Sequence, residues 1–304
     1  MSDKARSMVL GSFIGDSLAL GVHWIYDQSR IARERGRVEA LLAPPPDSYH
    51  KSKKAGDLTH YGDQTMVLLE SLAEGGGFDL AGFSARWRSL FEGGQDVYLD
   101  RATRNTLSRL AEGWGPTEAG SGSDELAGAS RIAPLVYALR DAPEAMASAC
   151  RAQTTMTHNN AKVADASEFF GRTALAVLDG VPPADAMAAA LKGRLPGSPL
   201  HAWFEDAMKA ASEDSVAAIA RFGQSCHMDG AFQSTVQLIA AHAGDPAGAL
   251  TASAMAGGDS AARNMLAGMV LCACNGVEAL PRSWVEGLNA RTRIEELLAK
   301  LDRA

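Results

Sequence analysis

The turn formed by Gly257, Gly258 and Asp259 is the segment of this chain whose residue types best suit chemistry. An apolar run at 265–271, long enough to belong to a buried helix, follows it. Glycine lets a backbone approach a ligand closely, and the first turn of a helix leaves N–H groups free to bind an anion. Asp259 at such a start can cap the helix or hold a cation, and Arg263 follows one helical turn later. The segment therefore indicates a site at the start of a buried helix.

Other clusters also place polar residues beside glycine or at expected helix ends. They lie at 15–17 with 23–27, at 60–65, at 128–134 and, as a weaker signal, at 157–160. Each has a simpler explanation. Asp63 could only cap its helix, His23 beside Trp24 could be a satisfied, half-buried histidine, and Arg131 could form a buried salt bridge. Taken together, the clusters favour a functional site.

The elements that must position these clusters are predicted to be helices. Of the 304 residues, 46% are hydrophobic and only 6% aromatic; alanine is abundant and β-branched runs are few, which favours helix over sheet. Helical patterns occupy 7–21, 63–75, 79–92, 100–111, 124–139, 142–157, 160–179, 184–192, 200–211, 213–222, 231–242, 246–255, 259–274 and 290–302. No alternation of period two is long enough for a central strand. We therefore expect one all-α domain over residues 1–304.

A long loop is predicted at 41–62, where proline, glycine and lysine are concentrated. Long loops inside compact domains are often functional, and the position of this one before Asp63 is consistent with a lid. Its short basic run at 51–54 is interpreted as part of a solvated loop. With a net charge of -7 and a pI of about 5.5, the chain shows no basic stripe for nucleic acid.

Cysteine usage and hydropathy predict a cytoplasmic protein that does not enter a membrane. The four cysteines have no Cys-x-x-Cys spacing, and we expect four free thiols: Cys150, Cys226, Cys272 and Cys274. The N-terminal apolar stretch is interrupted by Ser12, Gly15 and Asp16, unlike a signal peptide. No window reaches the roughly 18 uncharged apolar residues of a spanning helix.

The order of the polar motifs resembles the ADP-ribosylglycohydrolase superfamily over about residues 7 to 276. The motifs are Gly15-Asp16, the block at 60–65, the block at 128–134, Thr157-His158, and Gly257-Gly258-Asp259. The resemblance implies a single orthogonal bundle of many helices. It also implies hydrolysis of the N- or O-glycosidic bond that joins ADP-ribose to an acceptor, usually with two Mg²⁺ ions.

The chain departs from this family at its metal motifs. The family's Thr-Asp-Asp-Thr corresponds here to residues 62–65, where Asp63 is kept but Gln64 replaces the second carboxylate. Its Gly-Gly-Asp-Thr-Asp-Thr corresponds to residues 257–262, where Asp259 is kept but Ala261 replaces a carboxylate. Hydroxyl positions become Gly62 and Ala262. Mg²⁺ prefers octahedral oxygen coordination with one or two carboxylates for each ion. We expect Asp63 and Asp259 to hold at most one weakly bound Mg²⁺, or none.

Two substitutions bear on how such a site could work without metal. The position of a family glutamate, seven residues after Asp16, is occupied by His23. Arg263 could replace one cation by neutralising Asp259 and also Asp63, since guanidinium stays charged and pairs with carboxylates. A surface helix pair with Asp259, worth about 0.3–0.5 kcal/mol, is the competing interpretation of Arg263.

The preferred hypothesis is a hydrolase that cleaves a glycosidic bond of an ADP-ribosyl or related nucleotide-sugar substrate. Its catalytic residues would be Asp63, Asp259 and His23. Substrate or an ADP-ribosylated acceptor would contact His60, Tyr61, Gly128, Ser130, Arg131, His158 and Arg263. The alternatives are a pseudoenzyme that binds ADP-ribose or a nucleotide without turnover, and a structural protein, since relatives of this fold serve as lens crystallins.

Overall fold

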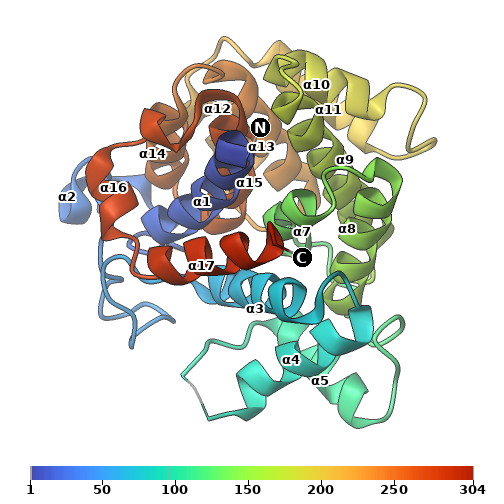
Figure 1. The fold of residues 1–304 in the computed structure, drawn as a ribbon. Helices are drawn as coiled ribbons and strands as arrows, with labels where there is room; N and C mark the ends of the chain where they lie inside the picture. Colours follow the sequence, from blue (N-terminus) through green and yellow to red (C-terminus); the bar gives the residue numbers. More distant parts are fainter. Residues whose placement is uncertain (1, 95, 304) are drawn as a thin grey trace.

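The computed structural model describes residues 2–94 and 96–303, without the side chain of Ser2. Across these residues it contains helices and no strand, apart from single β-bridges between Ser121 and His158 and between Glu125 and His227. The all-α prediction is confirmed (Figure 1).

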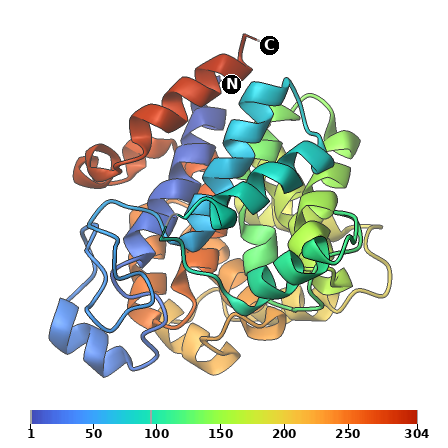
Figure 2. The ribbon, with the colours of Figure 1, turned by 90° about the horizontal axis from the view of Figure 1, so that it is seen from below.

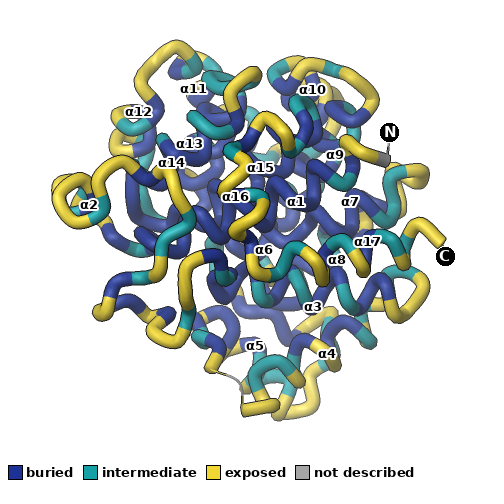
Figure 3. The backbone as a smooth tube through the Cα atoms, turned by 60° about the vertical axis from the view of Figure 1, so that its left-hand side comes forward, coloured by how far each residue is buried: buried dark blue, intermediate teal, exposed yellow. Residues whose placement is uncertain are grey.

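The centre of the molecule is a pair of closely packed helices, α1 (Ser2–Ala19) and α15 (Ser260–Asn275). Figure 3 shows both surrounded by other elements, and most of their residues are buried. A Cβ added to Gly11 would lie 2.4 Å from the carbonyl oxygen of Gly268, and one added to Gly15 would lie 2.3 Å from that of Asn264. The two backbones therefore touch, and glycine is what permits the contact. This contact fixes α1, which carries Asp16, against the first turns of α15.

The remaining helices surround this pair. They are α2 (Gln28–Arg35), α3 (His60–Gly75), α4 (Leu80–Glu92), α5 (Arg101–Ala111), α6 (Ala127–Ser130), α7 (Ala133–Ala138), α8 (Pro143–Thr157), α9 (Ala161–Leu178), α10 (Pro183–Leu191), α11 (Leu200–Lys209), α12 (Ser215–Phe222), α13 (Met228–Ala241), α14 (Pro246–Ala256), α16 (Arg282–Gly287) and α17 (Arg291–Leu301), with a 3₁₀ turn at Val277–Ala279. One large apolar cluster draws residues from α1 through α17. Figure 2 shows the two ends of the chain close together, and Arg6 pairs with Asp302 there.

Most predicted helices agree with the structure to within a few residues, and the exceptions have local causes. The helix α2 was not predicted because its sequence is polar and only Ile31 is buried; Asp27 caps its start. The short α16 was also missed. The predicted segment 124–139 is divided into α6 and α7, because the chain turns between them. The long loop ends at Thr59 rather than at 62, since Thr59 caps α3.

Two further expectations can be compared with the fold. All four cysteines are free thiols, as predicted. None of the helices within residues 2–94 and 96–303 combines the length and apolar character needed to cross a membrane.

Candidate functional site

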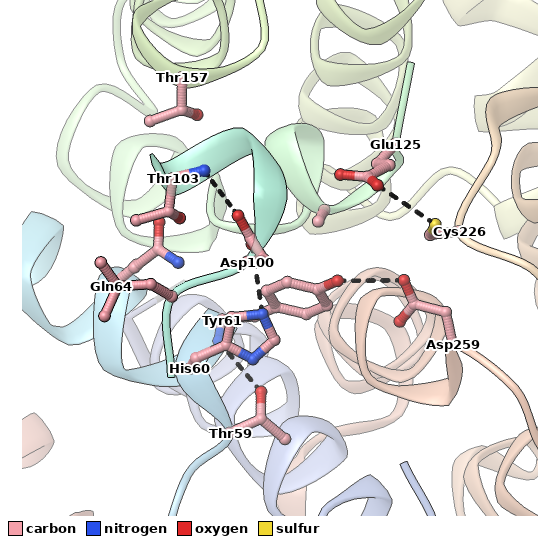
Figure 4. A network of polar contacts seen from close by, with 12 residues as sticks. Thr59, His60, Tyr61, Gln64, Asp100, Thr103, Glu125, Thr157, Cys226 and Asp259 are labelled. Atoms are coloured by element: carbon pink, nitrogen blue, oxygen red, sulfur yellow. Dashed lines mark hydrogen bonds and ion pairs between the residues drawn. The ribbon is translucent and has the colours of Figure 1, made fainter. Parts of the chain in front are cut away.

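The first turn of α3 joins residues from distant parts of the chain. Thr59 caps this turn by accepting a hydrogen bond from the N–H of Tyr61. His60, Tyr61 and Gln64 then extend from the helix toward separate partners (Figure 4). All three side chains are buried, so their polar atoms depend on contacts within the protein.

Asp259 lies at the start of α15, and its side chain is 1% exposed. The Tyr61 hydroxyl donates a hydrogen bond to its Oδ2 over 3.2 Å, as Figure 4 shows. Its Oδ1 lies 3.8 Å from Nδ1 of His23 and has no hydrogen-bond partner among the described residues. Burial raises the pKa of Asp259 to about 6, although the charges of Arg263 and His60 act to lower it. A carboxyl with this pKa changes protonation near neutral pH, which suits acid–base chemistry.

His23 is buried beneath Trp24, with the two rings stacked at 4.3 Å between centroids. Neither ring nitrogen of His23 has a hydrogen-bond partner in the described part of the chain. Burial lowers the pKa of His23 well below its ordinary value, so the imidazole is neutral. Trp24 has a left-handed φ of 64°, which is unusual for a bulky residue, and its N–H donates to the carbonyl of Gly258. This strained segment thus holds His23 against the glycine turn that carries Asp259.

Two further histidines, His50 and His60, lie together at the first turn of α3. Nδ1 of His60 is 2.9 Å from Nε2 of His50, and Nε2 of His60 is 3.3 Å from Oδ2 of Asp100. Asp100 also accepts a hydrogen bond from the N–H of Thr103 over 2.6 Å (Figure 4). Burial acts to raise the pKa of Asp100, but His60, His158 and the Thr103 N–H outweigh it and hold that pKa below its ordinary value.

Asp16 is fully buried and bound by the cap of α3. Its two oxygens accept hydrogen bonds from the N–H of Thr59 at 2.7 Å and from the Thr59 hydroxyl at 2.5 Å. A Cβ on Gly62 would lie 2.2 Å from Asp16 Oδ2, so the carboxyl fills the space that a side chain at position 62 would need. Burial raises the pKa of Asp16 to about 6, against these hydrogen bonds. A hydroxyl side chain at position 62 would therefore clash with the buried carboxyl of Asp16.

Asp63, in the first turn of α3, is bound by a lysine. The ammonium of Lys53 lies 2.8 and 2.7 Å from its two oxygens, and the side chains are only 18% and 16% exposed. Burial nevertheless keeps the pKa of Asp63 above its ordinary value. The pair lies in the wall of a cavity of about 1090 Å³ between α3, α4 and α17. The interpretation of the 51–54 run as a solvated loop is wrong for Lys53, because this lysine compensates a largely buried carboxylate.

The 128–134 block is packed behind the first turn of α3. The Arg131 guanidinium is 1% exposed and donates to Gln64 Oε1 over 2.7 Å, to Gln153 Oε1 and to Thr157 Oγ1. Within the described residues it makes no ion pair, so the salt-bridge interpretation is wrong; burial lowers its pKa to about 10. The guanidinium charge is therefore stabilised by hydrogen bonds to neutral side-chain oxygens.

The other predicted binding residues near this block are also enclosed. Ser130 donates to the Ala127 carbonyl over 2.9 Å. A Cβ on Gly128 would lie 2.7 Å from the His158 ring, so glycine is needed for that contact. His158 is 2% exposed, with Nε2 at 3.6 Å from Glu125 Oε2. These contacts account for the residue types without a ligand.

The sequence model of the ADP-ribosylglycohydrolase family matches residues 1–304. The chain belongs to the ADP-ribosylglycohydrolase family. Crystallin J1B of Tripedalia cystophora is 23% identical over 303 residues, covering 94% of this chain and 92% of that protein. An uncharacterized protein of Archaeoglobus fulgidus is 31% identical over 139 residues, covering only 45% of this chain and 44% of its own length.

A solved structure described as an ADP-ribosylglycohydrolase-related protein complex shares the fold, with a TM-score of 0.76 at 22% identity. The alignment covers 99% of this chain and 98% of that one. The expectation of an ADP-ribosylglycohydrolase-type fold is therefore confirmed.

The family's divalent metals do not fit the donors found here. Gln64 Oε1 accepts hydrogen bonds from Arg131 and from Nε1 of Trp87, so it is engaged elsewhere. Both oxygens of Asp63 are taken by Lys53. Across residues 2–94 and 96–303, no three His, Cys, Asp or Glu side chains are grouped to hold a metal ion. We therefore derive no step of this ADP-ribosylglycohydrolase-family protein through Mg²⁺.

Arg263 does not bind the carboxylates that it was predicted to neutralise, although its charge acts to lower the pKa of Asp259. Its guanidinium donates to the carbonyls of Ser253, Gly257 and Gln224, and to the Ser253 hydroxyl, but contacts neither Asp259 nor Asp63. The Ser253 and Gly257 carbonyls lie in the last turn of α14 and directly after it, where a cation is favourable, and Gln224 lies between α12 and α13. The alternative, a surface pair, is also wrong, because Arg263 is 0% exposed. Its contacts favour a structural role.

Sequence analysis missed Lys53, His50 and Asp100 as site residues, and gave no role to Asp16. Only Asp100 had a usable signal, since it stands at the first position of the predicted helix 100–111, where a capping carboxylate is common. The other contacts join segments 10 to 43 positions apart through the loop before α3, and no local pattern encodes them.

Proposed function

We propose that this protein hydrolyses a glycosidic bond of an ADP-ribosyl or related nucleotide-sugar substrate, with Asp259 and His23 acting without a bound divalent metal. Membership of the ADP-ribosylglycohydrolase family supports the substrate class. The burial and contacts of Asp259 and His23 support their assignment as the reacting residues.

The observation that carries the proposal is the buried pair formed by Asp259 and His23. Asp259 Oδ1 and both nitrogens of His23 are buried with no hydrogen-bond partner in residues 2–94 and 96–303, and Oδ1 lies 3.8 Å from Nδ1. An unpaired buried polar group costs about 1–3 kcal/mol. Polar atoms left unpaired in one place are those expected to serve a ligand rather than the fold.

The reaction needs a charge stabiliser and a base, and these two groups match those roles. The glycosidic bond breaks as the sugar acquires oxocarbenium character, which the Asp259 carboxylate stabilises. The neutral His23 imidazole takes a proton from the attacking water, whose oxygen bonds to the anomeric carbon. The proton then passes from His23 to the leaving nitrogen or oxygen. Asp63 is less suited than predicted, because Lys53 occupies both of its oxygens.

Trp24 stacks on His23, and two further aromatic residues pack against Trp24, which gives surfaces for a base or ribose. Trp24, Tyr49 and Tyr98 pack against one another with centroids 5.1 to 5.4 Å apart, and Tyr49 is 63% exposed. Aromatic faces of this kind stack well on planar rings. Because Trp24 lies on His23, a substrate must displace the indole to reach the imidazole.

One observation favours the second candidate function, binding of ADP-ribose without turnover. The Lys53–Asp63 ion pair and the near-complete burial of Asp259 describe a site in which the family's carboxylates are already compensated or enclosed. Such a site can keep a ligand cleft while lacking catalysis.

The test combines turnover with binding. Purified protein is incubated with ADP-ribosylated arginine and serine peptides, with Mg²⁺ or EDTA, and released ADP-ribose is quantified. Thermal unfolding with ADP-ribose is measured alongside, since a ligand at 100 times its Kd should add about 2.7 kcal/mol of stability. We expect release that persists in EDTA and is lost in His23→Ala, while ligand stabilisation remains.

His201→Ala is the matched control, because the hydrogen bonds of that histidine within the described part of the chain go to the Arg194 and Leu195 carbonyls. Full activity of His23→Ala would remove His23 from the chemistry. Stabilisation by ADP-ribose without release from any peptide would favour the binding protein. Absence of both would reject both candidates.

A further inference from the structure

The contacts around His60 define the protonation of two buried imidazoles. The backbone N–H of His60 donates to Nε2 of His50 over 3.4 Å. That nitrogen must therefore carry a lone pair, because an N–H there would face another N–H. His50 accordingly carries its single proton on Nδ1.

The same lone pair determines one nitrogen of His60. Nδ1 of His60 lies 2.9 Å from Nε2 of His50, and two lone pairs at this distance would repel. Nδ1 of His60 is therefore an N–H that donates to His50.

The opposite nitrogen of His60 meets a carboxylate. Nε2 lies 3.3 Å from Oδ2 of Asp100, an ion-pair distance, although the N–H direction is not aligned well enough for a good hydrogen bond. A lone pair beside an ionised carboxylate would again be repulsive, so this nitrogen also carries a proton. Both ring nitrogens of His60 are then protonated.

We propose that His60 is held as an imidazolium, a resident organic cation that supplies this site with the positive charge that its relatives take from divalent metal. The proposal concerns the charge of the site and holds whether or not the protein turns over a substrate.

The surrounding charges support this assignment. Burial raises the pKa of Asp16, Asp63 and Asp259, and the charge of His60 is one of the smaller effects that act against it. At Asp100, against the effect of burial, His60 is the leading cause that holds the pKa below its ordinary value. Burial and the charge of His60 lower the pKa of His50 to about 2, which keeps His50 neutral as its hydrogen bonds require.

The other nearby cations are engaged elsewhere. Lys53 binds Asp63, and Arg263 donates its hydrogen bonds to backbone carbonyls, although its charge also acts to lower the pKa of Asp259. Arg131 donates to neutral side-chain oxygens. His60, paired with Asp100 at the first turn of α3, is therefore placed to act as the cation shared by these carboxyls.

Imidazole nitrogens in ¹⁵N-labelled protein report the protonation directly. Long-range ¹H–¹⁵N spectra at neutral pH should show two N–H-type nitrogens for His60, and one N–H-type and one lone-pair nitrogen for His50. The seven histidines are assigned by single His→Gln variants. A lone-pair nitrogen on His60 in the folded wild-type protein would overturn the proposal.

A second variant covers the case in which His60→Gln does not fold. Asp100→Asn keeps an oxygen that can accept from Thr103 but removes the carboxylate charge, and His60 should then lose one of its two N–H signals. Glu125→Gln is the matched control, since it removes the carboxylate beside His158 and should leave the His60 signals unchanged. A His60 that keeps both protons in Asp100→Asn would contradict its pairing with Asp100.

Adding Mg²⁺ separates this inference from the proposed hydrolysis. We expect no change in the His60 spectrum on addition of Mg²⁺. An imidazolium at His60 with no release of ADP-ribose would reject the hydrolase alone. Turnover that requires Mg²⁺, with a neutral His60, would reject both proposals.

Discussion

Replacing Asp259 by asparagine should make the protein more stable at neutral pH. The pKa of this buried carboxyl is raised to about 6 from an ordinary value of 3.8. At 1.36 kcal/mol for each pH unit, its ionised form costs the fold about 3 kcal/mol. Asp259→Asn removes that charge with almost no change of shape, and Tyr61 can still donate to the amide oxygen.

The increase in the free energy of unfolding caused by Asp259→Asn should become larger as pH rises. Because the folded pKa lies above the unfolded one, the folded state holds an extra proton between about pH 4 and about pH 6. The penalty appears as pH rises through that window and is complete above it. We therefore expect Asp259→Asn to raise the free energy of unfolding by up to about 3 kcal/mol at about pH 7.5, and to change it little at about pH 4.

Urea-induced unfolding at these two pH values measures the effect, with an unchanged m-value as the check that the same transition is compared. Asp16→Asn is the matched comparison, because the pKa of Asp16 is raised to about 6 as well. An amide at position 16 can keep the hydrogen bond from the Thr59 N–H, but its NH₂ group then faces the Thr59 hydroxyl, whose proton loses its acceptor, so the gain should be smaller than for Asp259→Asn. Equal stabilisation of Asp259→Asn at both pH values, or a loss at neutral pH, would refute the reasoning.

Two further predictions concern packing and the lysine pair. Gly11→Ala should lower the free energy of unfolding by about 1–3 kcal/mol in thermal or urea unfolding, because its Cβ would lie 2.4 Å from the carbonyl oxygen of Gly268. Gly75→Ala is the control and should leave the stability unchanged or slightly higher, because the added Cβ would meet no described atom within 4 Å. Equal losses of stability in the two variants would contradict the packing argument. Lys53→Met should raise the pKa of Asp63, which Lys53 acts to lower, in carboxyl ¹³C titrations; an unchanged titration would show that the pair does not form in solution.

Much of the fold was predictable because helix formation is governed by neighbours along the chain. The α5, α8, α9 and α13 patterns all predicted helices at nearly the right bounds, since apolar residues recur at helical spacing there. The failure at α2 follows from the same rule. A short polar helix with one buried residue has little apolar periodicity, and its start depends on the Asp27 cap.

The candidate site was predictable only where a motif carried its own geometry. Asp259 follows a glycine turn at a helix start, and its placement there was foreseen correctly. Arg263 was assigned to the wrong partner, because spacing of one helical turn cannot show that the end of α14 lies against the same side chain. The sequence around Lys53 is polar and predicts a solvated loop, because nothing in that run shows that the Asp63 carboxylate on α3 lies within reach of the lysine.

The helical class and the resemblance to the family follow from the sequence alone, as does the expectation that Gln64 and Ala261 replace metal-ligand carboxylates of the family. These features depend only on which residues occur and on their order along the chain. Which cation compensates which carboxylate was settled by tertiary packing. Lys53 reaches Asp63, and His60 lies between His50 and Asp100, through contacts across loops and helices. Charge interactions depend on distance and burial in three dimensions, and neither is written in the spacing of residues along the chain.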